Sequence, residues 1–292
     1  MKPSPFSYHD PRSVADVLGL LADEPNSKLL AGGQSLMPML NLRFLQPDSV
    51  IDLNKVAEIS DLTAGAEEIR IGAMVRQRAM QFDGNLHTHA PIFRHALQFV
   101  GHYQTRARGT IGGSLCHLDP SAEMPAVVLL HDATMHVGTR SGPRDVPVRE
   151  WAAGYMSPSL EPDELLVDLS FKPWSLGHGW GFHELARRRG DFALAAAGCL
   201  LELDANGRVT RVALVLSGVS YVPTRLEAVE GLLIGQTITA ELMKAVEQEA
   251  KQAVEMDDVH VPMAYRQQLA SVLLRRSITD AVKRAEEFQR AI

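Results

Sequence analysis

The beginning of the chain carries an apolar pattern that predicts one helix between two short strands. Apolar side chains recur at helical spacing over residues 13–23, with a serine at the N-cap position. Short apolar runs at 28–30 and 49–53 are typical of buried strands, and residues 35–45 favour a helical turn between them. Together these segments predict a small lobe that ends near residue 55.

The middle of the chain alternates strand-like runs with segments of helical periodicity. Strands are predicted at residues 69–73, 134–138 and 165–171. Helices are predicted at residues 91–101 and 120–130, the second with Asp119 as its N-cap. This texture predicts a second lobe of mixed composition, followed by a glycine-rich connector at residues 173–181.

The last third of the chain predicts strands first and helices afterwards. The strands are expected at residues 182–187, 193–203 and 211–217, with a hairpin turn at Asn206-Gly207. Amphipathic periodicity predicts helices at residues 223–234, 240–255 and 264–288. The pattern is typical of an antiparallel sheet covered by helices.

Two glycine-rich segments stand out because each follows an apolar run and has backbone N–H groups that an anion can approach closely. The first motif comprises Ala31, Gly32, Gly33, Gln34, Ser35 and Leu36, and the second motif comprises Thr110, Ile111, Gly112, Gly113 and Ser114. Without β-carbons, successive N–H groups can converge on a phosphate, and the two serines add hydroxyl donors. Two such loops suit the linked phosphates of a dinucleotide, which makes FAD the leading ligand.

An ordinary interpretation of the same motifs stays open, since glycine pairs also occur in tight turns and at strand ends. The G-x-G-x-x-G fingerprint of a Rossmann nucleotide site is absent from the sequence. A nucleotide site in this chain would therefore be of another type.

Composition describes an ordinary globular protein of 292 residues, 46% of them hydrophobic and 22% charged, which is long enough for two domains. A net charge of −6 creates no positive potential that would hold nucleic acid. No apolar stretch is long enough to span a bilayer, so we expect a cytoplasmic protein.

Only two cysteines occur, Cys116 and Cys199, so this chain cannot hold an iron–sulfur cluster with four cysteines of its own. No histidine cluster predicts a metal site, and Cys116 is interpreted as a buried space-filling residue.

Several segments match a known family in their order along the chain. They are residues 6–11 (FSYHDP), 31–39 (AGGQSLMPM), 71–74 (IGAM), 109–119 (GTIGGSLCHLD), 187–197 (RRRGDFALAAA) and 265–276 (YRQQLASVLLRR). On these marks the chain resembles the FAD-binding medium subunit of molybdenum hydroxylases, the family of carbon monoxide dehydrogenase, quinoline 2-oxidoreductase and xanthine dehydrogenase. The resemblance runs nearly end to end.

The resemblance implies an α+β fold in two parts. The first is a two-lobed FAD-binding domain of the vanillyl-alcohol oxidase or PCMH type. The second is a C-terminal domain of a three-stranded antiparallel sheet and a helical bundle. The implied boundaries are 1–55 for the first lobe, 56–176 for the second lobe and 177–292 for the C-terminal domain.

The resemblance also implies which residues hold the cofactor, with the flavin diphosphate between the two motifs and held mainly by their backbone N–H groups. Asp119 and Glu123 match acidic positions that reach the ribose or adenine, and Lys28 is a further candidate; the two acids also suit a helix N-cap and first turn. Asp191 and Phe192 match the place where relatives lay a tyrosine against the isoalloxazine ring. Phenylalanine keeps the stacking but lacks the hydroxyl, and a core phenylalanine is the other interpretation of this position.

The implied task is electron transfer, in which the flavin supplies the chemistry and no catalytic side chain of this chain is required. Electrons would arrive from [2Fe–2S] clusters in a small subunit, after a large subunit oxidises the substrate at molybdenum–pterin, and would leave to an external acceptor. Relatives assemble as a dimer of heterotrimers. The expected substrate is an N-heteroaromatic such as quinoline, with carbon monoxide next, and the acceptor stays open among quinone, cytochrome, NAD and dioxygen.

Two other classes of function stay open at this point. The chain could be a self-contained FAD-dependent oxidase or a non-catalytic dinucleotide-binding protein. The short connector before the C-terminal domain leaves little sequence for a domain that caps a substrate, which disfavours the oxidase.

Overall fold

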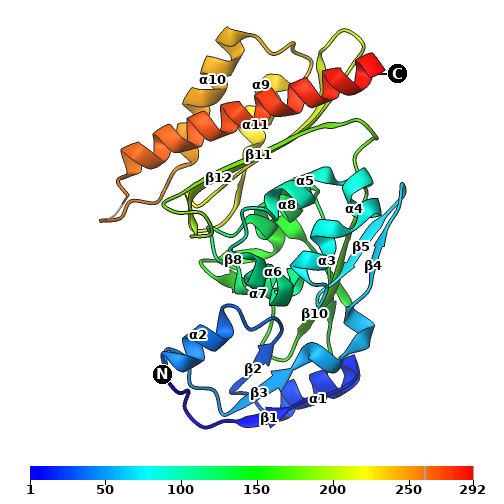
Figure 1. The fold of residues 1–292 in the computed structure, drawn as a ribbon, viewed down its shortest axis with the longest axis vertical. Coiled ribbons are helices and arrows are strands. Elements are labelled where there is room, and N and C mark those ends of the chain that lie inside the picture. Colours follow the sequence, from blue (N-terminus) through cyan, green and yellow to red (C-terminus); the bar gives the residue numbers. More distant parts are fainter. Residues whose placement is uncertain (260, 292) are drawn as a thin grey trace.

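The computed structural model describes residues 1–259 and 261–291 and stacks three parts along its long axis (Figure 1). The first lobe is built on a parallel sheet of order β1-β3-β2. Its elements are β1 (Ser7–His9), α1 (Val14–Asp23), β2 (Ser27–Leu30), α2 (Leu36–Asn41), β3 (Ser49–Asp52) and the 3-10 turns η1 (Leu53–Lys55) and η2 (Ala57–Ile59). Helix α1 is capped as predicted, because the Ser13 hydroxyl accepts the N–H of Asp16 at 3.1 Å.

Two features of the first lobe differ from the expectation. Strand β1 was not predicted, because its three residues carry no apolar alternation and are ordered by pairing with β3. The helical turn predicted over residues 35–45 is shorter, since α2 ends at Asn41 and the chain then reverses through Arg43 in the left-handed region (φ 56°).

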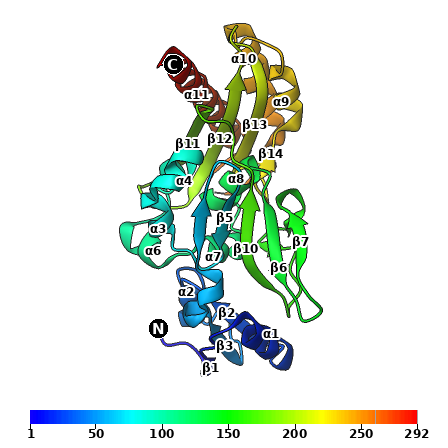
Figure 2. The ribbon, with the colours of Figure 1, turned by 90° about the vertical axis from the view of Figure 1, so that its right-hand side faces the viewer.

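The second lobe is an antiparallel sheet of order β4-β5-β10-β6-β7, with helices on one side of it (Figure 2). The strands are β4 (Leu62–Ala64), β5 (Ile69–Gly72), β6 (Thr134–Gly138), β7 (Arg144–Pro147) and β10 (Leu165–Phe171), and a small hairpin pairs β8 (Ala152–Gly154) with β9 (Ser157–Pro158). The helical segments are α3 (Gln77–Phe82), α4 (Gly84–His89), α5 (Pro91–Ala96), α6 (Tyr103–Arg108), α7 (Ile111–His117), α8 (Glu123–Leu130) and the 3-10 turn η3 (Val148–Glu150). The three strands predicted here are all present.

The helices of the second lobe are shorter than their pattern suggested. The helix predicted over residues 91–101 stops at Ala96, and the chain turns through Gly101 at φ 45°. Helix α8 begins at Glu123 after Ala122, so the prediction that Asp119 is its N-cap is wrong. Asp119 Oδ1 instead accepts the N–H of Ser121 at 2.8 Å in the turn before the helix.

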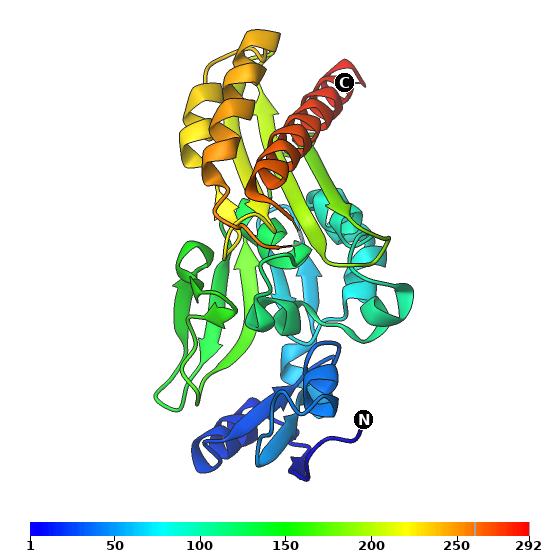
Figure 3. The same ribbon diagram turned by 90° about the vertical axis from the view of Figure 1, so that its left-hand side faces the viewer.

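The C-terminal domain contains the three long antiparallel strands that were predicted, and the short β14 joins their edge. Its elements are β11 (Gly179–Ala186), β12 (Ala193–Leu203), β13 (Val209–Ser217), β14 (Thr224–Arg225), α9 (Glu227–Leu233), α10 (Ala240–Ala250), η4 (Lys251–Ala253) and α11 (Met263–Ala291). Helix α11 runs across the sheet with α9 and α10 beside it (Figure 3).

Strand β12 is apolar on both sides because the C-terminal sheet is covered on both faces. Ala196 and Leu200 join the core of the second lobe, whereas Ala197, Cys199 and Leu201 pack toward the helices. The C-terminal domain is thus held to the second lobe by a shared core. No helix in the described part of the chain is both long and apolar enough to cross a bilayer.

Candidate cofactor site

The fold brings the two glycine-rich motifs side by side between the first and second lobes. A β-carbon on Gly32 would lie 2.3 Å from the carbonyl oxygen of Arg108, two residues before the second motif. A β-carbon on Gly113 would lie 3.5 Å from Cβ of Ala31. The approach at Gly32 is therefore possible only because that residue is a glycine, whereas a β-carbon on Gly113 would make an ordinary contact with Ala31.

The first motif is a turn whose backbone donors face no partner within the chain. It leaves strand β2, takes Gly33 at φ 72°, and enters helix α2. Within residues 1–259 and 261–291, no N–H of Gly32, Gly33, Gln34 or Ser35 donates to another group of the chain. Ser35 makes no side-chain cap on α2. A row of unpaired N–H groups around a left-handed glycine is the geometry of an anion-binding nest.

The second motif differs from the expected open loop, because it is the first turn of helix α7. The hydroxyl of Thr110 caps this turn by accepting the N–H of Gly113 at 3.0 Å. The N–H groups of Ile111 and Gly112 donate to Val75 and Ala73, at 3.1 and 2.9 Å. The prediction of a second nest of free amides is therefore wrong; Ser114, which is half-buried, keeps a hydroxyl that donates to no group of the described chain.

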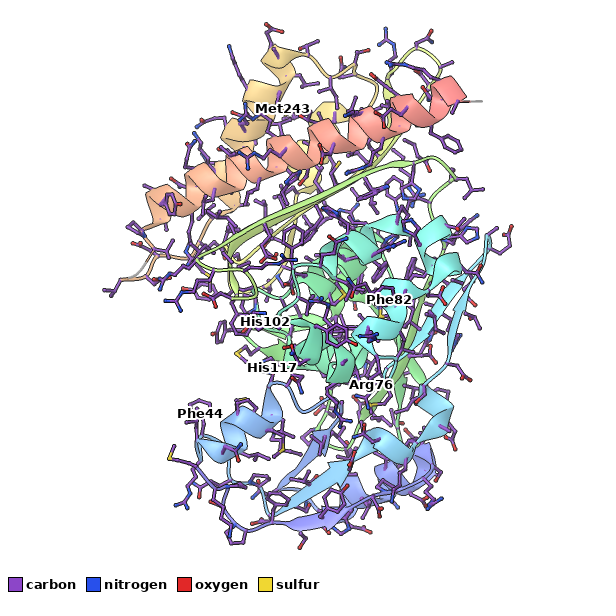
Figure 4. All side chains as sticks on the ribbon, viewed as in Figure 1. Phe44, Arg76, Phe82, His102, His117 and Met243 are labelled. Carbon is purple, nitrogen blue, oxygen red and sulfur yellow. The ribbon has the colours of Figure 1, made fainter. Side chains whose placement is uncertain are left out.

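Arg76 ties the two motifs together, and the sequence analysis did not single it out. Its guanidinium donates to the carbonyl of Arg108 and to the side-chain oxygen of Asn54. The amide of Asn54 in turn donates to the carbonyl of Ala31 at 3.1 Å. Arg76 lies where the first and second lobes meet (Figure 4). Burial lowers the pKa of Arg76, and the nearby Arg108 lowers it further.

The remaining predicted residues lie at different depths around the motifs. Lys28 is exposed on β2, next to the first motif. Asp119 is half-buried in the turn that follows α7. Glu123 is only 9% exposed, and its carboxyl contacts that of Glu184 on β11. Burial raises the pKa of Glu123 to about 7.

Asp191 and Phe192 lie in the hairpin between β11 and β12, at the edge of the C-terminal domain. The ring of Phe192 is 67% exposed and makes no ring contact with the described residues, so it is not a core phenylalanine. The hairpin leans on the second lobe, since a β-carbon on Gly190 would lie 2.6 Å from the ring of His102. His102 precedes α6, which leads directly into the second motif.

The two thiols are not candidates for redox chemistry. Burial raises the pKa of the Cys116 thiol to about 12 and that of Cys199 in the same direction. We therefore expect the folded chain to resist iodoacetamide at about pH 8, because on the order of 10⁻⁴ of the Cys116 thiol would be thiolate. Mass spectrometry of labelled protein tests this; alkylation as fast in the folded as in the urea-unfolded chain would contradict it.

Among the described residues no cluster of His, Cys, Asp and Glu could hold a metal ion.

Comparison with known proteins shows the family to which the chain is similar. Residues 4–173 match the family described as FAD binding domain in molybdopterin dehydrogenase, and residues 180–281 match the CO dehydrogenase flavoprotein C-terminal domain. The chain is 33% identical over 287 residues to the 6-hydroxypseudooxynicotine dehydrogenase complex subunit alpha of Paenarthrobacter nicotinovorans, covering 98% of this chain and 97% of that relative.

Solved structures give the same answer. The carbon monoxide dehydrogenase from Hydrogenophaga pseudoflava superposes with a TM-score of 0.94 at 31% identity, over 97% of this chain and 99% of that one. Quinoline 2-oxidoreductase from Pseudomonas putida 86 superposes with a TM-score of 0.93 at 32% identity, over 98% and 99%.

Fold and motifs together define an FAD-binding oxidoreductase subunit. More narrowly, the chain belongs to the family of FAD-binding medium subunits of the molybdenum hydroxylases. The resemblance drawn from the sequence and the α+β fold class are both confirmed.

Proposed function

We propose that this chain binds FAD with its diphosphate against the first motif and transfers electrons between [2Fe–2S] clusters of a small subunit and an external acceptor. The observation that carries the proposal is the row of unpaired N–H groups from Gly32 to Ser35, in a turn that packs against the backbone just before the second motif. Backbone donors of this kind suit a diphosphate, because they need no side chain and leave room for its oxygens. The residues present therefore fit the cofactor.

Each part of the chain has a distinct task in this proposal. The first motif binds the diphosphate. The second motif supplies the hydroxyl of Ser114, and its backbone is held in a fixed position because its N–H groups are already hydrogen-bonded within the chain. Arg76 holds the two motifs in register. Lys28 and Asp119 lie toward the ribose and adenine, and Asp191 and Phe192 lie toward the flavin ring. Glu123 was expected beside the ribose as well, but its carboxyl is buried against Glu184 and is not free for the cofactor. When bound, FAD supplies the one- and two-electron chemistry; the residues of this chain bind and orient it and keep one edge open.

The relatives favour an N-heteroaromatic substrate for the whole complex. One close relative acts in a 6-hydroxypseudooxynicotine dehydrogenase complex, and a solved relative acts on quinoline. Carbon monoxide is the second candidate, from the dehydrogenase of Hydrogenophaga pseudoflava. Oxidation of the substrate would take place at molybdenum–pterin in a large subunit.

The proposed assembly is a dimer of heterotrimers, each with a large, a medium and a small subunit. The domain boundaries that we propose are 1–55, 56–176 and 177–292. The proposal is supported by the three larger sheets, because each lies within one of these ranges. Two free cysteines, Cys116 half-buried and Cys199 buried, suit a reducing compartment, so we propose a cytoplasmic location.

Purification of the complex from its native source tests the proposed function. We expect flavin, iron–sulfur and molybdenum signals to copurify with this chain, and the substrate to bleach the flavin only when the partner subunits are present. Bleaching of the flavin in the isolated chain by substrate would instead indicate a self-contained oxidase. Bound FAD with no reduction in either setting would indicate a simple binding protein.

A further inference from the structure

Two glutamates meet where the second lobe packs against the C-terminal domain. Glu123 opens helix α8, and Glu184 lies on β11, on the sheet face that carries Phe182 into the core of the second lobe. The two carboxyls lie against each other, Glu123 is only 9% exposed, and Oε2 of Glu184 is buried with no hydrogen-bond donor among the described residues. An ionised carboxylate only accepts hydrogen bonds, so this contact requires a proton on one of the two groups.

The surrounding charges account for one carboxylate of the pair and not for the second. Arg106 of α6 attracts the carboxylate of Glu123, whereas Asp119 repels it. The other charged or titratable groups near the pair are Arg189 of the β11–β12 hairpin, which faces Arg106, His117 beside Asp119, and, on the opposite side of β11, His183 with its partner Asp280. Arg106 can compensate the charge of one carboxylate, and Asp119 opposes it. If both glutamates were ionised, the second carboxylate would have no cation to compensate it.

We propose that Glu123 and Glu184 hold one shared proton, and that this protonated pair positions the C-terminal domain against the second lobe beside the flavin site. Glu184 lies two residues before the end of β11, where the strand leads into the hairpin carrying Phe192. Opening of the contact would release that hairpin from the edge of the site. The role assigned to the closed arrangement rests on the proposed function, but the proton-holding contact belongs to the chain itself.

The direction of the pH dependence follows from the two acids. Burial is the main cause that raises the pKa of Glu123 to about 7 and that of Glu184 to about 8, and the charge of Glu123 raises the latter further. Groups in such contact titrate as a pair. We call the arrangement with the two carboxyls in contact the closed state. Because both pKa values are raised in this state, its stabilisation relative to the open state is fully present below the ordinary glutamate pKa. Above that pKa the stabilisation is lost, with the opening equilibrium rising by up to about tenfold per pH unit, until pH passes the raised values of about 7 to 8.

Hydrogen exchange of the full chain tests this proposal, with and without FAD. The opening equilibrium of amides 179–186, corrected for the intrinsic exchange rate, is measured between about pH 5.5 and pH 8.5. In the wild type we expect opening to increase by up to about tenfold per pH unit until the shared proton is lost. In Glu184→Gln, whose amide can donate to Glu123 at every pH, we expect a much flatter profile.

A matched variant and a second measurement keep the test decisive. Glu241→Gln removes an exposed acid from α10 of the same domain and should follow the wild-type profile. Infrared spectroscopy of the wild type at about pH 6.5 should show the carbonyl band of a protonated carboxylic acid, at a pH where ordinary glutamates are ionised. Equal pH slopes in wild type and Glu184→Gln, or absence of that band, would overturn the proposal. A chain that shows the slope but binds no FAD would contradict the proposed function alone.

Discussion

Replacing Gly32 with alanine is expected to weaken FAD binding strongly. The added β-carbon would lie 2.3 Å from the carbonyl oxygen of Arg108 and 2.7 Å from Cα of Gly109, which are backbone atoms that cannot rotate away. The two motifs must then separate. Overpacking of this kind costs about 1–3 kcal/mol, which corresponds to FAD affinity weaker by roughly fivefold to more than a hundredfold. The flavin-to-protein absorbance ratio and a fluorescence titration with FAD measure the effect.

Gly19→Ala is the matched control for this variant. Gly19 lies in helix α1, and a β-carbon there would meet nothing within 4 Å. We expect this variant to keep full FAD binding and to gain up to about 1 kcal/mol in the free energy of unfolding, because alanine favours the helix. If Gly32→Ala bound FAD as well as Gly19→Ala does, close contact between the motifs would have no part in the site.

Arg76→Ala is expected to have the second large effect, on both stability and cofactor binding. The substitution leaves the carbonyl of Arg108 and the side chain of Asn54 without their charged donor, and Asn54 then loses its orientation toward Ala31. Hydrogen bonds from a charged group contribute about 1.5–3 kcal/mol, so we expect a loss of about 2–3 kcal/mol in the free energy of unfolding. Chemical denaturation and FAD titration measure the two consequences.

Two further variants separate the role of the guanidinium from that of charge alone. Arg76→Lys keeps the charge, but an ammonium cannot serve both acceptors with the planar fork of arginine, so it should rescue FAD binding only in part. Arg140→Ala removes an exposed arginine from the second lobe and should change neither quantity. Full FAD affinity in Arg76→Ala would show that the motifs hold their register without this side chain.

Much of the fold could be predicted from the sequence because the long elements carry strong periodicity. Strands β10, β12 and β13 and helix α11 are regular enough that their apolar pattern alone identifies them. The short helices of the second lobe could not be bounded in this way. Most have only six or seven residues, and they end where tertiary contacts, rather than local sequence, turn the chain.

The chemistry of the second motif could not be predicted because its partners are remote in the sequence. Gly112 has no side chain, so helix α7 can lie directly on Ala73, where a β-carbon would be 2.6 Å from Cβ of that residue. This contact uses the N–H groups of Ile111 and Gly112, which the sequence analysis had assigned to a phosphate. A Gly-Gly pair in an isolated sequence looks the same in both situations.

Arg76 and Glu184 were missed for a related reason. Each is a single charged residue that follows or interrupts an apolar run, and nothing local marks it as different from a surface residue. Their importance comes from what faces them across a lobe or domain boundary: the carbonyl of Arg108 in one case and the carboxyl of Glu123 in the other. The first motif, in contrast, could be singled out from the sequence, because its glycines present backbone N–H groups without the help of remote residues.

The position of the diphosphate in a crystal structure of the FAD-bound chain tests the central claim most directly. The account predicts diphosphate oxygens within about 3 Å of backbone nitrogens between Gly32 and Ser35, with Ser114 on the other side. A diphosphate held elsewhere, with those four N–H groups left facing solvent, would contradict it.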